Sequence, residues 1–543
     1  MIDNKRRLPA WVKAVIATGS VLLFLLIIML GAEAWARHKI RTTIEKEAIA
    51  VAGTPVTVRI GRIGVSLTGR SISIRNITLH SQNNDPVKAD SAVIVSLDGV
   101  VEQISFRGIG YRKTGGKPAL SAYEVVIDTP QGTLVTRAIE KHRSEGEKKD
   151  FRQTVTERLN SVVVGRIEIH DAGVEYVRWI SDNDERRFKL TGGKLTANDF
   201  RIDSTAAADR ILFCKNIELH VTSARYGYGA GTMVAEADTL SASSAGALSM
   251  AALRLVPQFA KDEYAQKSKG HKDWTRVEVS DVQGWGVDFR RMIAGEIVAA
   301  DSISIAGAEI GNYKNKQVYR EPVNKPLLWQ SLQNLPITLD INKIDFTDVA
   351  FRYDELSETG TTPGTVRFSG GKGEMLNVTN IAEGHDPYFT VRVSALLMDS
   401  GQLDATFNFP VSPALDHFRV TGTLGKSNMS SFNSALTPLI NIRVDSGVMN
   451  GLSFELDGTQ TSSHIEMTML YDGLSVSLLK SRDHSRERDF LTLVANDMLI
   501  RNANPTADGR VRTASGHYTR DPHRSTFNYI WKSFVPAITK TVL

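Results

Sequence analysis

The sequence of 543 residues has a single cysteine, Cys214, so the chain cannot form an intramolecular disulfide. Cys214 alternates with Leu212 in an apolar run, and we interpret it as a core residue. No long basic block is present either, because 65 Lys and Arg residues are interspersed with 60 Asp and Glu residues. A net charge of +5 distributed in this way argues against a nucleic-acid partner.

The signatures of common catalytic and cofactor sites are also missing. VTGTLGKS resembles a phosphate-binding loop at its end, but Val420 stands where that loop needs its first glycine. The glycines of YGYGAG at 226–231 have the wrong spacing for a dinucleotide site and indicate a hairpin turn. The 12 histidines form no H-E-x-x-H motif, and no G-x-S-x-G elbow occurs. We expect no catalytic, cofactor-binding or metal site.

Near the N-terminus, residues 14–32 (AVIATGSVLLFLLIIMLGA) carry no charge. As a helix they would measure about 28 Å, close to the hydrocarbon thickness of a bilayer. We predict a transmembrane helix over 14–34 after a cytoplasmic tail of 1–13, with Trp11 and Trp35 at the membrane interfaces. The alternative is a cleaved signal peptide, whose apolar region is usually shorter.

The orientation of this helix does not follow from its flanks. Four basic residues lie on each side, which are Lys5, Arg6, Arg7 and Lys13 before the helix and Arg37, Lys39, Arg41 and Lys46 after it. We place the N-terminus in the cytoplasm because about 500 strand-rich residues follow, and long domains translocate largely regardless of charge.

The body of the chain has the two-residue period of β-strands. SLTGRSISIRNITLH at 66–80 carries its large apolar residues at Leu67, Ile72, Ile74, Ile77 and Leu79. The same texture predicts a mainly β fold, with an elongated, repetitive, curved antiparallel sheet and a few short helices. We expect a β-rich region over 35–255 with a helical insertion at 133–160, a helical or loop connection at 256–285, and a second β-rich region over 286–523.

An internal repeat supports this organisation. VGRIEIHDAGVEY at 164–176 matches INKIDFTDVAFRY at 341–353, and this pairs Ile167 with Ile344 and Ile169 with Phe346. Downstream, FKLTGGK at 188–194 matches VRFSGGK at 366–372. Repeated strand units predict a sheet that grows by addition, in which each unit buries its apolar side only with its neighbours. The alternative is chance similarity among strands rich in Val, Ile and Thr.

Residues 524–543 have the spacing of an amphipathic helix, with Phe527, Trp531 and Phe534 on its apolar side. Two interpretations remain open. The helix either docks on the edge of the sheet or lies at a membrane interface, where Trp, Phe and Lys are favoured.

The order of these features carries a resemblance to a known family. An N-terminal anchor followed by VRIGRIGVSLTGRSISIRNITLH and VKADSAVIVSL resembles the start of AsmA-like proteins of the Gram-negative envelope. SALLMDSGQLDATFNFPV at 394–411 and NYIWKSF in the tail are similar to the C-terminal part of such proteins.

The resemblance implies an inner-membrane anchor with the bulk of the chain in the periplasm, and a groove-like sheet that contributes to phospholipid transfer or outer-membrane biogenesis. Its partners would be phospholipid acyl chains, the inner membrane and other envelope proteins. The predicted groove lining is Leu67, Ile72, Ile74, Ile77, Leu79, Ile167, Ile169, Ile344 and Phe346. The alternative is a non-enzymatic envelope scaffold or assembly factor, in which the same residues fill a closed core.

Overall fold

The computed structural model describes residues 49–51, 54–66, 68–81, 93–114, 116–137, 155–157, 159–181, 184–203, 210–268, 272–319, 321–412, 414–479 and 500–543. The predicted helix at 14–34, Trp11, Trp35, Leu67 and residues 138–154 lie outside these ranges. Of the helices in the described ranges, none has the length and apolarity needed to cross a bilayer. The chain divides into two compact units, Met1–Leu253 with Gly284–Ile297 and Arg254–Gln283 with Val298–Leu543.

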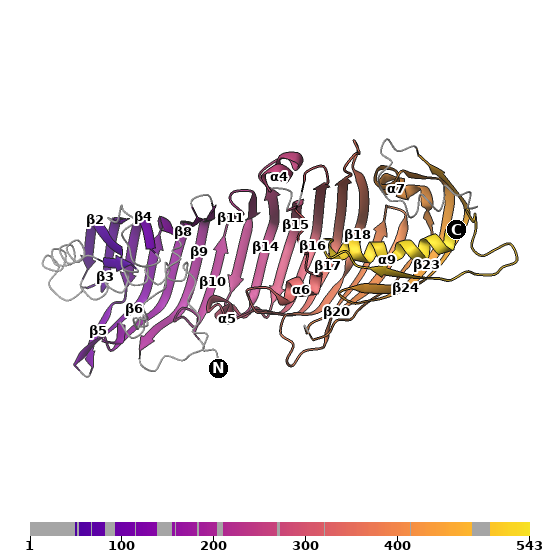
Figure 1. Ribbon diagram of the computed structural model, residues 1–543. Helices are drawn as coiled ribbons and strands as arrows, with labels where there is room; N and C mark the ends of the chain where they lie inside the picture. The colour runs from indigo at the N-terminus through magenta and orange to yellow at the C-terminus, as the bar shows by residue number, and fades with distance from the viewer. Residues whose placement is uncertain are drawn as a thin grey trace. The chain divides into compact units, whose positions relative to one another are not determined.

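The first unit is built almost entirely from strands (Figure 1). These are β1 (Ile49–Val51), β2 (Thr54–Ser66), β3 (Ser71–Ser81), β4 (Val93–Arg107), β5 (Gly110–Thr114), β6 (Lys117–Asp128), β7 (Gln131–Arg137), β8 (Ser161–Ser181), β9 (Asp184–Asp203), β10 (Asn216–Val221), β11 (Ser223–Tyr228), β12 (Met233–Ala237), β13 (Thr239–Ser243) and β14 (Ala247–Pro257). One short helix, α5 (Phe289–Ile293), starts at Asp288, whose side chain accepts a hydrogen bond from Arg291 N.

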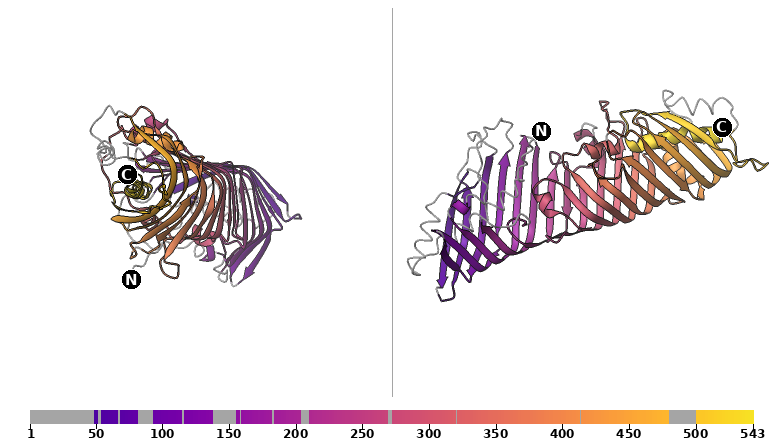
Figure 2. Two further views of the ribbon diagram at one scale, coloured as in Figure 1. Left: turned by 90° about the vertical axis from the view of Figure 1, so that its right-hand side faces the viewer. Right: turned by 90° about the horizontal axis from the view of Figure 1, so that it is seen from below.

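The second unit combines strands with several short helices and one long helix. Its strands are β15 (Trp274–Trp285), β16 (Val298–Asn315), β17 (Leu339–Leu356), β18 (Gly364–Thr379), β19 (Tyr388–Leu397), β20 (Gly401–Pro410), β21 (Phe418–Leu424), β22 (Ser427–Asn428), β23 (Ile442–Gly458), β24 (Ser462–Leu478) and β25 (Ala514–Thr519). Its helices are α4 (Lys261–Lys267), α6 (Leu328–Gln333), the 3₁₀ turn η2 (Met429–Phe432), α7 (Asn433–Ile440) and α9 (Thr526–Val542). The strands of this unit bend around α9 (Figure 2).

The mainly β fold is confirmed, but the prediction of a purely antiparallel sheet is wrong. Strand β8 runs parallel to β6 and β7, and β17 runs parallel to β16. Parallel neighbours need a crossover connection, which residues 138–160 supply in the first unit and residues 316–338, with α6, in the second. Apolar alternation is the same in both kinds of pairing, so the sequence pattern could not separate them.

Two predicted helical segments are partly strand. Residues 133–137 belong to β7, where Leu134 is buried, so the helical insertion cannot begin at 133. The predicted connection at 256–285 holds α4 as its helical part, but from Trp274 onward it forms β15. In both places strand pairing outweighs local helical pattern.

The repeat is present as a structural unit with matching backbone irregularities. Asp171 in β8 and Asp348 in β17 have φ of 51° and 53°, and Gly192 in β9 and Gly370 in β18 have φ of 62° and 58°. The strand register shifts beside them at equivalent positions, between Ile169 and Val174 in one copy and between Phe346 and Phe351 in the other. A second pair of left-handed residues, Asp199 (53°) and Asn377 (60°), follows Gly192 and Gly370 at the same distance in sequence. These β-bulges make chance similarity an insufficient explanation of the repeat.

A left-handed residue also explains the change of parity in the stretch at 66–80. Ile72 and Ile74 are two residues apart, but Ile77 comes three residues later. Between them Asn76 has a φ of 54°, which returns the following side chains to the same side, while the register with β2 and β4 continues without a shift. All three isoleucines are therefore buried in one cluster on the same side of the sheet.

We predict that the left-handed bulge at Gly370 is required for stability. A Gly370→Ala substitution meets no atom within 4 Å, so its cost of about 1–2 kcal/mol comes from the backbone conformation alone. Gly451→Ala is the matched control, since no positive φ is required there and its nearest neighbour is 4.0 Å away. Urea unfolding of the full chain, followed by tryptophan fluorescence, measures both. Equal midpoints for the two variants would contradict the prediction.

Candidate functional site: an apolar sheet face

One face of the sheet in the second unit is apolar across many strands, and we call it the apolar face. Side chains of directly paired residues on neighbouring strands point to the same side. The pairings align three rows: Ile303, Ile344, Met375, Val391, Phe407, Val420, Leu456 and Ile465; Ile305, Phe346, Gly373, Val393, Ala405, Gly422, Phe454 and Met467; and Ala395, Leu403, Leu424, Leu452 and Met469. Two of the predicted lining residues, Ile344 and Phe346, therefore lie on this face.

Burial of the apolar face changes along its rows. Val420, Leu456 and Ile465 are exposed by no more than 1%. On β16 to β19, by contrast, the residues of the same row are only half-buried. Within the described ranges, Ile344 and Phe346 belong to no cluster of buried residues, so this part of the face retains solvent contact.

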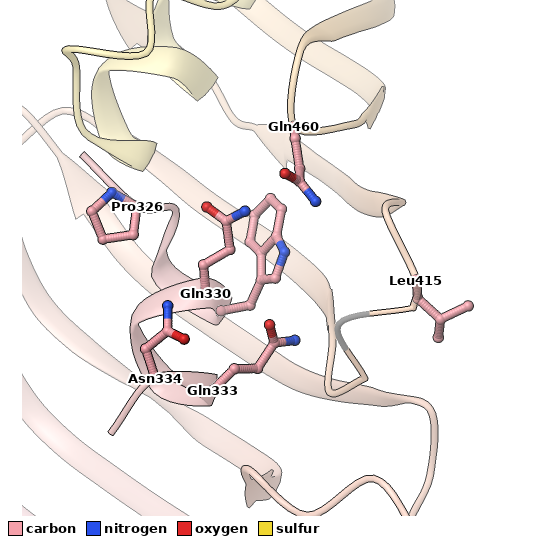
Figure 3. A pocket seen from close by; sticks show the side chains of 7 residues that line it. Pro326, Gln330, Gln333, Asn334, Leu415 and Gln460 are labelled. Carbon is pink, nitrogen blue, oxygen red and sulfur yellow. The ribbon is translucent and has the colours of Figure 1, made fainter. Parts of the chain in front are cut away.

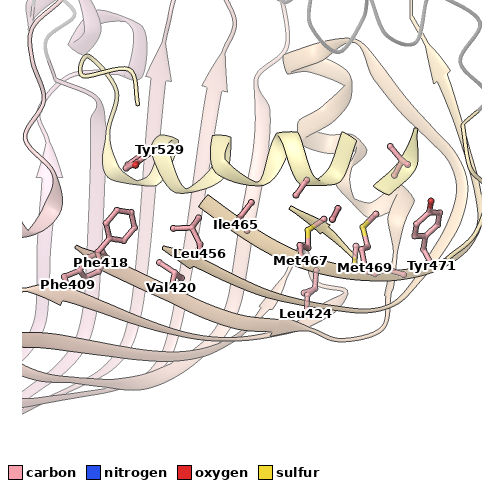
Figure 4. Close-up of a cluster of buried hydrophobic side chains, with 14 of the residues drawn as sticks. Phe409, Phe418, Val420, Leu424, Leu456, Ile465, Met467, Met469, Tyr471 and Tyr529 are labelled. Atoms are coloured by element: carbon pink, nitrogen blue, oxygen red, sulfur yellow. The ribbon is translucent and has the colours of Figure 1, made fainter. Parts of the chain in front are cut away.

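Helix α9 covers the sealed part of the apolar face (Figure 4). Ser525 caps its N-terminus by accepting a hydrogen bond from Asn528 N. Tyr529 packs edge-on against Phe418, with ring centroids 5.8 Å apart, and Phe534 packs against Phe454 at 4.8 Å. Each such aromatic pair is worth about 0.5–1.5 kcal/mol beyond the area it buries.

Docking of α9 bears on both interpretations of residues 524–543. The helix packs on the apolar face at the edge of the sheet. It lies closest to β25, which pairs only with β24 among the described strands, and Phe534 reaches Phe454 on β23. Phe534 points to this core, so its predicted membrane-facing role is not supported by its position. Phe527 and Trp531 remain 45% and 46% exposed and stay candidates for an interface.

The opposite face of the same strands carries ion pairs. Lys343 lies 3.3 Å from Glu374, Arg392 lies 2.5 Å from Glu374, and Arg419 lies 2.9 Å from Asp457. Hydrogen bonds from Arg392 and Lys343 hold the pKa of Glu374 below its ordinary value. Exposed pairs of this kind add little stability, but they keep this face solvated.

Six of the predicted lining residues lie together in the first unit. Ile72, Ile74 and Ile77 are buried in a cluster that also holds Val155 and Leu159 from the crossover. Leu79, Ile167 and Ile169 pack against it half-buried. The crossover therefore closes part of this face, as α9 does in the second unit.

A polar group of residues, which we call the rim cluster, ends the apolar face beside β16 and β17. Lys314 is the strand-register neighbour of Glu355 in the sheet. Glu355 accepts a hydrogen bond from Tyr353 Oη at 2.7 Å and forms an ion pair with Lys316 Nζ at 2.5 Å. The ring of Tyr353 lies 6.2 Å from that of Phe527 in α9, which places the cluster on the α9 side of the sheet.

Lys314 differs from the other cations of the rim cluster. In the part of the chain that the structure describes, Lys314 makes no ion pair within 4.0 Å, whereas Lys316 forms an ion pair with Glu355. Burial lowers the pKa of Lys314 to about 8, although the charges of Asp273 and Glu355 act in the opposite direction. The carboxyl of Glu355 is itself buried, which raises its pKa, but Lys316 and Tyr353 more than reverse this effect.

Two small pockets lie elsewhere in the second unit. One, of about 310 Å³, is lined by Pro326, Trp329, Gln330, Gln333, Asn334, Leu415 and Gln460 (Figure 3). Two of its amides are used by the fold, because Gln330 accepts a hydrogen bond from Leu327 N at the start of α6 and Gln333 donates to Val411 O. The other, of about 330 Å³, lies at Gly451 and Leu470 and includes polar residues such as Asp404 and Thr468 from the charged face. Neither pocket groups reactive side chains.

The chemistry of the described residues is accordingly limited. No group of three or more His, Cys, Asp or Glu side chains suited to a metal ion occurs in the described ranges. Cys214 is buried, and burial raises the pKa of its thiol to about 12, so it is a poor nucleophile at neutral pH.

Sequence reasoning missed most of the apolar face. Met375, Val391, Phe407 and Phe454 stand in alternating runs, but their common face depends on strand register, which alternation does not give. Lys314 could have been found, because it continues the two-residue spacing of Ile310 and Asn312 in β16.

We predict that truncation costs follow the burial gradient. Leu456→Ala removes a side chain with 0% exposure and should lower the free energy of unfolding by about 2–5 kcal/mol. Ile344→Ala, in the same row, should cost only about 1 kcal/mol, because its side chain is already partly in water. Urea unfolding of the full chain measures both, and equal costs would show that the face is sealed throughout.

A second prediction concerns the pH dependence that Lys314 imposes. Because its pKa is about 8 when folded and near 10.5 when unfolded, the folded chain binds fewer protons between these values, and stability rises with pH across that window. Lys314→Met should remove this rise and stabilise the protein most below pH 8. Lys372→Met, on the exposed side of β18, is the control and should leave the pH profile unchanged. Identical profiles for wild type and Lys314→Met would refute the assignment.

Comparison with known proteins adds no relative. No protein-family model matches the chain, and no curated protein matches its sequence. The likeness to AsmA-like proteins therefore depends on the sequence features described above.

Proposed function

We propose that the protein is an inner-membrane-anchored periplasmic protein of AsmA-like type that binds phospholipid acyl chains on its apolar sheet faces and contributes to phospholipid transfer or outer-membrane biogenesis. One observation carries the proposal. The row from Ile303 to Ile465 is apolar throughout, yet it is buried only where α9 lies on it.

The physical chemistry of acyl chains favours such a surface. Backbone polar groups of the strands are paired in the sheet ladder, so a chain lying across the strands meets only apolar side chains. Covering half-exposed residues such as Ile344 and Phe346 would gain about 25 cal/mol for each Å² removed from water. In the second row the rings of Phe346 and Phe454 lie over Gly373 and Gly422, where an added Cβ would come within 2.8 and 2.7 Å of them.

The location of the protein rests on the sequence. The apolar segment at 14–34 would anchor it, with Trp11 and Trp35 at the interfaces and the strand-rich body in the periplasm. Phe527 and Trp531, exposed on α9, are candidates for a second contact with a membrane or an envelope partner.

A non-enzymatic envelope scaffold or assembly factor is the second candidate. The observation that favours it is closure. Ile72, Ile74 and Ile77 have no more than 7% exposure, and α9 seals β21 to β24. On this alternative the half-buried residues on β16 to β19 contact a protein rather than lipid.

The two candidates are separated by photo-crosslinking in cells. A benzophenone amino acid at Phe346 lies on the half-buried apolar face, whereas the same residue at Lys372 lies on the exposed side of the adjacent strand. We expect lipid adducts at 346 that exceed those at 372 by about tenfold, detected by mass spectrometry of the full-length protein.

Protein adducts without lipid at position 346 would favour the scaffold. Equal lipid adducts at the two positions would contradict the proposal, because they would reflect membrane proximity alone.

A further inference from the structure

Within the proposed lipid-binding function, we infer that Lys314 binds the anionic headgroup of a lipid whose acyl chains lie on the apolar face of β16 to β18. The inference depends on the proposed function and specifies the ligand as an amphiphile with a negatively charged phosphate headgroup.

Lys314 lies at the end of an apolar strip of the sheet. Lys314 follows Ile310 and Asn312 along β16, and the pairings place Ile310 beside Phe351 and Lys314 beside Glu355. Phe351 packs on Phe368 of β18, with ring centroids 6.1 Å apart. An apolar strip two to three strands wide therefore ends at the ammonium group of Lys314. An anionic lipid has a matching order, in which apolar acyl chains are followed by a negatively charged headgroup.

The charges around Lys314 do not balance. The charges that act on Lys314 are those of Asp273, Glu355, Lys316 and Lys325, so three lysines, counting Lys314 itself, stand against two carboxylates. Glu355 is committed to Lys316 and Tyr353 at hydrogen-bond distance. The cluster has one positive charge in excess, and an anion at Lys314 would neutralise it.

The position of Lys314 is also energetically unfavourable. A partly desolvated ammonium without an ion pair is costly, and replacing it by an apolar residue would stabilise the chain unless the charge has a use. Its pKa of about 8 reflects that cost. A phosphate oxygen is the kind of acceptor that forms a short, charge-assisted hydrogen bond with an ammonium group.

Among the described residues of β16 to β18, Lys314 is the one cation on the apolar side of the sheet. Lys343 and Arg392 lie on the opposite, charged face and are paired with Glu374 at 3.3 and 2.5 Å. Selectivity for an anionic headgroup would therefore depend on Lys314 rather than on the general charge of the protein.

The test measures headgroup selectivity of the full-length protein. The purified chain in detergent is incubated with equal amounts of phosphatidylglycerol and phosphatidylcholine that carry the same acyl chains, and bound lipids are counted by native mass spectrometry. We expect the wild type to prefer phosphatidylglycerol by about tenfold at pH 7, and Lys314→Met to bind the two lipids about equally. Lys314→Arg should keep the preference, and Lys372→Met, exposed on the opposite side of β18, should match the wild type.

A pH series gives an independent readout. The preference should weaken between pH 7 and pH 9 in the wild type, as Lys314 loses its proton, and should stay flat in Lys314→Arg. Equal binding of both lipids by the wild type, or an unchanged preference in a folded Lys314→Met variant, would overturn the inference while the proposed function stands. Binding of neither lipid would overturn both.

Discussion

The structure depends on keeping the apolar side chains of each long strand on one face. A shift of one residue would move every following side chain to the other side, and β17 and β18 have 18 and 16 residues over which this could happen. Left-handed bulges such as Asp348 and Gly370 absorb the extra residues. Because the same irregularities recur at Asp171 and Gly192, the bulges are part of the repeated unit, and both the apolar and the charged face follow from them.

The repeat also determines which parts of each apolar face are covered. Each copy contains a parallel strand pair, and a parallel pair requires a crossover that leaves the sheet and returns over one face. In the first unit the crossover contributes Val155 and Leu159 to the core, and in the second α6 contributes Trp329, which packs on Phe409 and Phe418. In the second unit α6 reaches Phe409 and Phe418 on β20 and β21, whereas Ile344 on β17 stays half-buried.

The sequence was sufficient to predict the strand-rich fold, the repeat and the helical C-terminus, because each rests on local periodicity. The parallel pairings were missed, since Ile303 and Ile344 alternate with polar residues in the same way as strands in antiparallel pairs. The sequence could not distinguish buried Ile74 from half-buried Ile344 either. That difference depends on segments distant in the sequence. Val155 and Leu159 cover part of the apolar side in the first unit, α9 covers part of the apolar face in the second, and no local pattern encodes where they dock.

The two faces of the second unit also differ in how they treat charge, and this bears on function. On the solvated face Arg392 and Lys343 share Glu374, and Arg419 lies beside Asp457. Such pairing costs little there because water still screens the charges. On the apolar face Lys316 is paired with Glu355, whereas Lys314, the direct sheet neighbour of Glu355, is not. A chain selected only for stability would have a neutral residue at this position, since a partly buried ammonium without a counterion opposes folding. Its retention beside an unsealed apolar strip is best explained if the missing negative charge is supplied by the molecule that covers the strip.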